Sequence, residues 1–162
     1  MTAWANRSPI AAAMLNPALV AAVLATAAQG YEKETGQGMP WSLSFVVAPM
    51  VLHQSTRQAL PTSTRTHLAV WAGKNPLVRA GFPARAQALV DPVKEATRFG
   101  LAHRALTLEA GGRLYSTYQR PRGYRPPGQQ LDQMLRKAGL VGRWLAKADN
   151  PATVFAVLGV TP

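Results

Sequence analysis

A chain of 162 residues can bury roughly 70 % of its unfolded surface in one domain, so it needs neither a disulfide nor a metal to fold. The chain has no cysteine, which excludes a disulfide scaffold, a thiolate zinc site and a cysteine nucleophile. Eighteen Lys and Arg residues against seven Asp and Glu give a formal net charge of +11, which points to nucleic acid, an anionic membrane surface or an acidic protein as the partner.

An Asx residue stands directly before proline four times, and each pair predicts the start of a helix. The Asx side-chain oxygen can accept hydrogen bonds from the free N–H groups of the first turn, and proline fits the first helical position because it has no N–H to satisfy. The four pairs are Asn16-Pro17, Asn75-Pro76, Asp91-Pro92 and Asn150-Pro151.

The N-terminal half is predicted to be helical. An apolar stripe at helical spacing predicts a core helix over residues 17–35, which ends at Gly36. Residues 42–53 are apolar on all sides, and their length favours a buried helix bent at Pro49 over a strand. A short turn of helix is predicted over residues 55–60.

The first thirty residues imitate a secretory signal, because an alanine-rich run follows Arg7. Asn16-Pro17 interrupts that run, so no stretch reaches the roughly 20 continuous apolar residues that a membrane-spanning helix needs. We therefore expect a cytoplasmic protein without a membrane anchor.

A change of periodicity predicts a helix followed at once by a β-hairpin. Residues 91–103 show helical spacing, with Asp91 as the expected N-cap, and from residue 104 the apolar residues recur with a period of two. The expected turn is 110–112, and residues 113–118 form the returning strand.

Two further helices, over residues 64–73 and 76–90, are predicted before the helix and hairpin. Three helices followed by a hairpin are typical of a winged helix-turn-helix. The predicted fold is therefore mainly α with one β-hairpin, as a winged helix-turn-helix-like domain flanked by N-terminal and C-terminal helices. The expected parts are an N-terminal tail (1–14), this domain (15–119), a Pro/Gly/Arg linker (120–128) and a C-terminal helical pair (129–162) that packs on the domain or docks a partner.

No local motif predicts catalysis. The chain lacks a nucleophile elbow and a phosphate-binding loop, and its seven carboxylates form no local acid/base pair. His53, His67 and His103 lie on different predicted elements without a second ligand at helical spacing. We expect a protein that is not an enzyme and that binds neither a metal nor a cofactor.

Positive charge is concentrated around the hairpin and the linker, interleaved with tyrosines. This pattern suits phosphate contact with base stacking, and it equally suits an ordinary solvated surface. The exposed side of helix 91–103 carries no Asn or Gln to read adenine, so base-specific recognition is not expected. The candidate nucleic-acid-binding residues are Lys94, Arg98, Arg104, Arg113, Arg120, Arg122 and Arg125.

Two aromatic residues mark the C-terminal helices as a candidate docking surface. Trp144 and Phe155 would anchor a partner, with Arg143 and Lys147 at the rim. The alternative is that both aromatic side chains pack in the core and anchor their own short helices.

Several motifs occur in an order that resembles a known family. The N-terminal half contains Asn16-Pro17-Ala18, Gly30-Tyr31-Glu32 and Val51-Leu52-His53, and the C-terminal part contains residues 142–147 and 152–156 before an ending at 158–162. Over roughly residues 15–162 the chain resembles the middle-component family of bacterial three-component ABC systems.

This resemblance implies a small non-enzymatic subunit encoded between an ABC-class ATPase, related to chromosome-maintenance proteins, and a third component. Such a subunit would bridge or regulate the ATPase in defence against phages or other mobile elements, with contact to nucleic acid and homodimerisation left open. The residues alone leave two alternatives. One is an independent winged-helix DNA-binding protein, either a transcriptional regulator or a non-specific binder, and the other is a protein held on a membrane surface.

Overall fold

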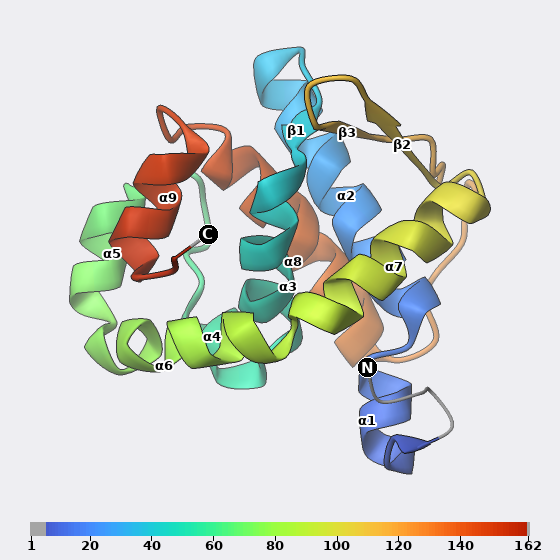
Figure 1. The fold of residues 1–162 in the computed structure, drawn as a ribbon, viewed down its shortest axis with the longest axis horizontal. Coiled ribbons are helices and arrows are strands. Elements are labelled where there is room, and N and C mark those ends of the chain that lie inside the picture. The colour runs from blue at the N-terminus through green and yellow to red at the C-terminus, as the bar shows by residue number, and fades with distance from the viewer. Residues whose placement is uncertain (1–5, 162) are drawn as a thin grey trace.

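The chain folds around one long helix, α2, which packs against both α7 and α8 in the computed structural model (Figure 1). Residues 6–161 are described, and they are mainly helical with one small antiparallel sheet, which confirms the predicted α fold with a β-hairpin. In chain order the elements are α1 (Pro9–Met14), α2 (Pro17–Thr35), β1 (Met39–Pro40), the 3-10 helix η2 (Trp41–Leu43), α3 (Ser44–Leu52), α4 (Gln54–Ala59), α5 (Leu68–Lys74), α6 (Pro76–Ala88), α7 (Val90–Ala102), β2 (Leu106–Glu109), β3 (Arg113–Ser116), α8 (Gln129–Leu145) and α9 (Pro151–Leu158).

Helix α2 begins and ends where the sequence predicts. The Asn16 Oδ1 accepts a hydrogen bond from the Ala18 N–H at 2.9 Å, and Pro17 occupies the first turn. The helix ends at Gly36, whose φ of 70° lies in the left-handed region that glycine adopts without steric cost. Both ends of the central helix are therefore set by local residues.

The stretch Pro9–Thr35, which includes α1 and α2, is long and apolar enough to cross a bilayer by length and composition alone. The sequence predicted no span because Asn16-Pro17 interrupts this stretch. Core helices meet the same criterion, and eight residues of α2 are buried within the protein. The predicted tail, residues 1–14, contains α1, and its first five residues lie outside the described part of the chain.

The predicted buried helix over residues 42–53 is confirmed as η2 and α3. Every residue of α3 except Phe45 is buried, and the helix continues through Pro49. The short helix predicted next is confirmed as α4. These elements place a continuous apolar segment against α2, α6 and α8.

Helices α5, α6 and α9 pack together at one side of the molecule (Figure 1). Asn150 caps α9 as predicted, since its Oδ1 accepts a hydrogen bond from the Thr153 N–H at 2.9 Å. Asn75 precedes α6, but its side-chain amide donates to the Trp71 carbonyl at 2.9 Å and makes no cap. Helix α6 runs through Pro83 without ending there.

The predicted role of Asp91 as an N-cap is wrong. Only Leu89 separates α6 from α7, so α7 already begins at Val90 and Asp91 lies inside its first turn. A carboxylate in the first turn still interacts favourably with the helix dipole, so the acidic residue suits this position.

The predicted hairpin is confirmed as β2 and β3, and the structure adds a third strand. Gly111 and Gly112 form the turn with φ of 90° and 76°. The two-residue strand β1 pairs with β3 through Met39 and Leu114, which gives the order β1-β3-β2. A strand this short, with Pro40 as half of it, carries no periodicity that the sequence could reveal.

Helix α8 lies against α2 at close range because glycines remove side chains from the crossing. A Cβ built on Gly142 would lie 2.7 Å from the carbonyl carbon of Ala27, and one built on Gly30 would lie 3.2 Å from the Arg143 backbone nitrogen. Glycine inside a helix lowers helix stability by about 1 kcal/mol relative to alanine. Gly142 instead permits the backbone of α8 to approach the backbone of α2.

A histidine before α4 provides a pH-dependent contribution to stability. The Nδ1 of His53 accepts a hydrogen bond from the Thr56 N–H at 3.4 Å. Burial first, and then the positive charges of Arg85 and Arg57, lower the pKa of His53 below its ordinary value of 6.5. The unfolded chain therefore binds this proton more readily than the folded protein does.

The lowered pKa of His53 determines how the stability of the protein changes with pH. The stability that comes from neutral His53 is present above pH 6.5 and is lost as the pH falls through the lowered pKa. We expect His53→Asn, which keeps a capping acceptor but does not titrate, to lose less stability than the wild type between about pH 7.5 and about pH 5. Urea unfolding at both pH values measures this, and equal losses in the two proteins would contradict it.

Candidate interaction surfaces

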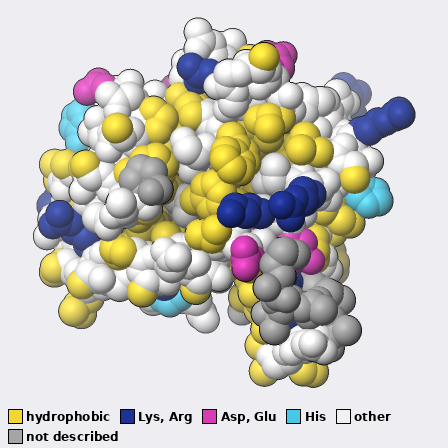
Figure 2. All heavy atoms as spheres, in the orientation of Figure 1, with side chains coloured by type: hydrophobic (Ala, Val, Ile, Leu, Met, Phe, Trp, Pro, Cys, Tyr) yellow, Lys and Arg dark blue, Asp and Glu magenta, His cyan; other side chains and the backbone are white. Residues whose placement is uncertain are grey.

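An apolar groove of about 420 Å³ lies where η2 and α3, the α6–α7 junction and the C-terminal segment meet. Figure 2 shows hydrophobic side chains gathered over this region, beside Lys and Arg side chains of α7. Among residues 6–161, no acidic residue lines the groove, and Lys94 is the one charged residue that does. The lining residues are Trp41, Ser42, Phe45, Pro83, Ala86, Gln87, Val90, Lys94, Phe155, Gly159, Val160 and Thr161.

Two aromatic side chains form one wall of the groove. Trp41 and Phe45 pack edge to face, with ring centroids 5.1 Å apart, and both remain partly exposed. The Trp41 Nε1–H is buried and finds no hydrogen-bond partner among the described residues. An unpaired buried donor costs about 1–3 kcal/mol, so this ring is held in place by its apolar contacts and not by its N–H.

The opposite wall is the end of the chain. Helix α9 ends at Gly159, whose φ of 69° reverses the backbone, and the Val160 N–H then donates to the Phe155 carbonyl at 2.9 Å. This turn brings residues 159–161 alongside Pro83 of α6. The groove is therefore built from three segments that are far apart in the sequence.

Two of the predicted partner-binding residues, Trp144 and Lys147, line one hollow of about 430 Å³, whereas Phe155 and Arg143 line other sites. Trp144 is 3 % exposed, its ring packs edge to face on Trp71, and its Nε1 donates to the Thr66 carbonyl at 2.6 Å. Phe155 is 7 % exposed and is one of the residues that line the groove. Arg143 lies beside α2, and exposed Lys147 lies beside the loop before α5.

The predicted nucleic-acid-binding residues are spread over two regions. Lys94 and Arg98 are exposed on α7, Arg104 is exposed just after it with a φ of 56°, and Arg113 donates from β3 to the Gly38 carbonyl at 3.1 Å. The remaining three, Arg120, Arg122 and Arg125, are exposed in the segment between β3 and α8.

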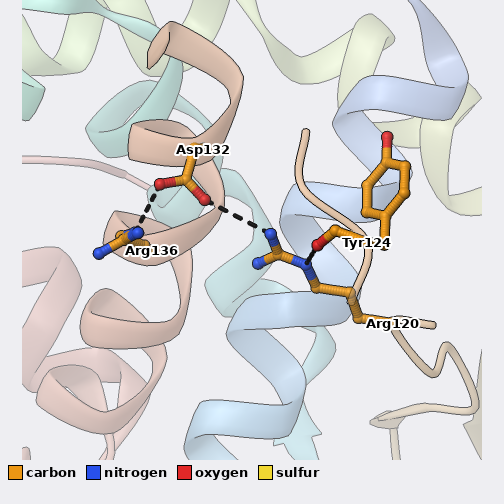
Figure 3. A network of polar contacts seen from close by, with 4 residues as sticks. All are labelled: Arg120, Tyr124, Asp132 and Arg136. Atoms are coloured by element: carbon orange, nitrogen blue, oxygen red, sulfur yellow. Dashed lines mark hydrogen bonds and ion pairs between the residues drawn. The ribbon is translucent and has the colours of Figure 1, made fainter. Parts of the chain in front are cut away.

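One of the linker residues is tied to α8. Figure 3 shows the Arg120 guanidinium contacting Asp132 at 3.5 Å, while Arg136 contacts the other oxygen of the same carboxylate at 2.6 Å. The Arg120 Nε also donates to the Tyr124 carbonyl at 3.3 Å, and its guanidinium lies 5.8 Å from the Tyr124 ring centroid. Asp132 therefore holds the linker against α8, because its carboxylate pairs with Arg120 of the linker as well as with Arg136.

Comparison with known proteins assigns almost the whole chain to one family. The family model for the ABC-three component (ABC-3C) system Middle Component 3 matches residues 4–162. The chain belongs to this family. No curated protein and no solved structure matched the chain. The resemblance to the middle components of three-component ABC systems is thereby confirmed.

Sequence reasoning missed the aromatic wall of the groove in this Middle Component 3 protein. Trp41 and Phe45 stand four residues apart directly after Pro40, which is the spacing that places two side chains on one face of a helix. That spacing could have identified the pair. The opposite wall carries no such signal, because residues 159–161 reach the groove only through the tertiary fold.

The described residues of the Middle Component 3 protein contain no cluster of three His, Asp or Glu side chains that could hold a metal ion. Two of its hollows combine apolar or aromatic side chains with basic ones, the groove beside Trp41 and Phe45 and a second hollow between α2 and α8. Such surfaces are suited to binding a macromolecule.

Proposed function

We propose that this Middle Component 3 protein is a non-enzymatic adaptor or regulatory subunit that docks the ABC-class ATPase of its system through the apolar groove. The observation that carries the proposal is the groove itself, with the partly exposed Trp41–Phe45 pair on one wall and no acidic residue among the described residues that line it. Aromatic pockets of this kind supply most of the binding energy at protein interfaces.

The charge of the groove specifies the partner segment. Lys94 is exposed at its edge, and the chain as a whole carries a net charge of +11. A complementary segment presents apolar side chains to the Trp41–Phe45 wall and a carboxylate to Lys94. We assign this segment to the ATPase, related to chromosome-maintenance proteins, and a second contact to the third component of the system.

Reversing the charge at Lys94 tests this docking mode. We expect Lys94→Glu to weaken binding of the co-expressed ATPase on the order of tenfold, because a carboxylate of the partner then meets a like charge. Lys147→Glu is the matched control, since it makes the same charge change at an exposed lysine on the other predicted docking surface. Titration by biolayer interferometry measures both.

Comparing these two variants decides whether the partner docks on the groove or on the surface around Lys147. A greater loss from Lys147→Glu than from Lys94→Glu would overturn the groove as the docking site. Failure of the three co-expressed components to purify together would overturn the adaptor role as a whole. Phage plating on cells that carry the complete system, with and without this chain, tests the proposed role in defence.

A second candidate function is an independent winged-helix DNA-binding protein. It is favoured by the order of α2, β1, α3, α7, β2 and β3 along the chain, with α4, α5 and α6 inserted between α3 and α7, and by the sheet order β1-β3-β2. In that interpretation α7 is the groove-reading helix and the hairpin is the wing. Binding of duplex DNA by the isolated protein, with affinity falling on the order of a thousandfold between roughly 50 and 200 mM salt, would support it.

A further inference from the structure

A basic cleft of about 300 Å³ lies between α2 and α8, away from the apolar groove. Its charged lining residues are Lys33 from α2 and Arg136 and Arg143 from α8, and no carboxylate lines it. Glu32 and Glu34 adjoin Lys33 along α2 but do not line the cleft. Three positive charges thus line the hollow, and one of them, Arg136, pairs with the Asp132 carboxylate at 2.6 Å outside that lining.

Two glycines let α2 and α8 approach each other closely along this cleft. Gly30 and Gly139 line it, and a Cβ built on Gly30 would clash with the Gly139 backbone. Arg136 and Arg143 are seven residues apart, which is about two helical turns or roughly 10 Å along α8. That spacing suits contact with successive phosphates of an extended strand.

The cleft continues into the linker through a shared carboxylate. Arg136 lines the cleft and holds Asp132, and Asp132 also contacts Arg120 (Figure 3). Tyr124 follows Arg120 in the linker and is 44 % exposed. Asp132 therefore joins the basic residues of the cleft to an exposed aromatic ring.

We propose that the cleft and the adjoining linker bind single-stranded nucleic acid, with Lys33, Arg136 and Arg143 on the phosphates and Tyr124 stacking on a base. Cations along a narrow groove, followed by an exposed ring, form the usual arrangement for binding single strands without sequence preference. The Asp132 carboxylate pairs with the guanidinium groups of Arg120 and Arg136. On binding, phosphates would replace this carboxylate as the partner of both groups. This site is distinct from α7 and the hairpin, and the proposal does not depend on the adaptor role.

A triple variant, Lys33→Gln, Arg136→Gln and Arg143→Gln, tests the cleft in the full-length protein. The probe is a fluorescein-labelled oligothymidylate of about 20 nucleotides, and fluorescence anisotropy measures its binding. We expect affinity to fall on the order of a hundredfold at low salt, and the slope of log affinity against log salt to decrease by about 2. The matched control replaces Arg65, Lys74 and Lys147, three exposed cations outside the cleft, with glutamine.

Two single substitutions test the linker. Asp132→Asn releases Arg120 and Arg136, so it is expected to raise affinity for the oligonucleotide severalfold. Tyr124→Ala is expected to lower affinity roughly tenfold, and Tyr124→Phe is expected to restore it because the ring still stacks. Circular dichroism of each variant checks that the helical content is unchanged.

Four outcomes would overturn the proposal. These are equal losses in the cleft and control triples, unchanged or lower affinity in Asp132→Asn, tighter binding of a duplex of the same length, and displacement of the probe by poly-glutamate as effectively as by unlabelled oligothymidylate. The last of these would identify an acidic protein as the ligand instead.

Discussion

Gly142→Ala is expected to lower the free energy of unfolding by about 3 kcal/mol. The new Cβ would lie 2.7 Å from the carbonyl carbon of Ala27 and closer still to its oxygen. Both obstructing atoms belong to the backbone of α2, so no side-chain rotation can relieve the clash and the two helices must separate. The loss exceeds the gain of about 1 kcal/mol that alanine brings to a helix in place of glycine.

Gly139→Ala, one turn earlier on the same helix, is the matched control. Its Cβ would meet nothing nearer than 3.7 Å, so only the gain in helix propensity remains and we expect a stabilisation of up to about 1 kcal/mol. Urea unfolding followed by circular dichroism measures both variants. If Gly142→Ala proved as stable as Gly139→Ala, the close approach of α2 and α8 would be refuted.

Arg57→Ala is the second substitution for which we expect a large effect, again a loss of about 3 kcal/mol. Arg57 is only 2 % exposed, and its Nη1 donates to the carbonyls of Val51 at 2.6 Å and Leu52 at 3.3 Å. These carbonyls lie at the end of α3, where the helix itself offers no partner. Alanine would leave a cavity and two unsatisfied acceptors.

Arg57→Met separates the two parts of that loss. Methionine keeps the apolar volume of the side chain and removes a cation whose pKa is lowered by burial. We therefore expect a loss of only about 1 kcal/mol for this variant, measured by thermal and urea unfolding. Equal losses in the methionine and alanine variants would mean that the hydrogen bonds to the end of α3, and not the filling of space, dominate the contribution of Arg57.

Residues close together in the chain determined most of the secondary structure. The start of α2 follows from Asn16-Pro17, the start of α9 from Asn150-Pro151, and the turn of the hairpin from two glycines. Each of these signals acts through contacts within four residues, so it operates before any tertiary structure forms. The order of the motifs also sufficed to identify the family.

Sequence reasoning failed where a residue's role depends on a distant neighbour. Asp91 has the local signature of an N-cap, but the one-residue connection between α6 and α7 moves the helix start ahead of it. Asn75 likewise donates to the Trp71 carbonyl instead of capping α6. The strand β1 exists only because β3 lies beside it.

The candidate sites divide in the same way. Composition alone established a large surplus of positive charge and the absence of a local catalytic motif, because both are properties of the residues themselves. Tertiary packing decided that Trp144 is buried against Trp71 while Trp41 and Phe45 line a groove, and that Lys33 faces the same cleft as Arg136 and Arg143. The physical reason is that burial and charge clustering depend on which segments meet in space, and local spacing does not encode those meetings.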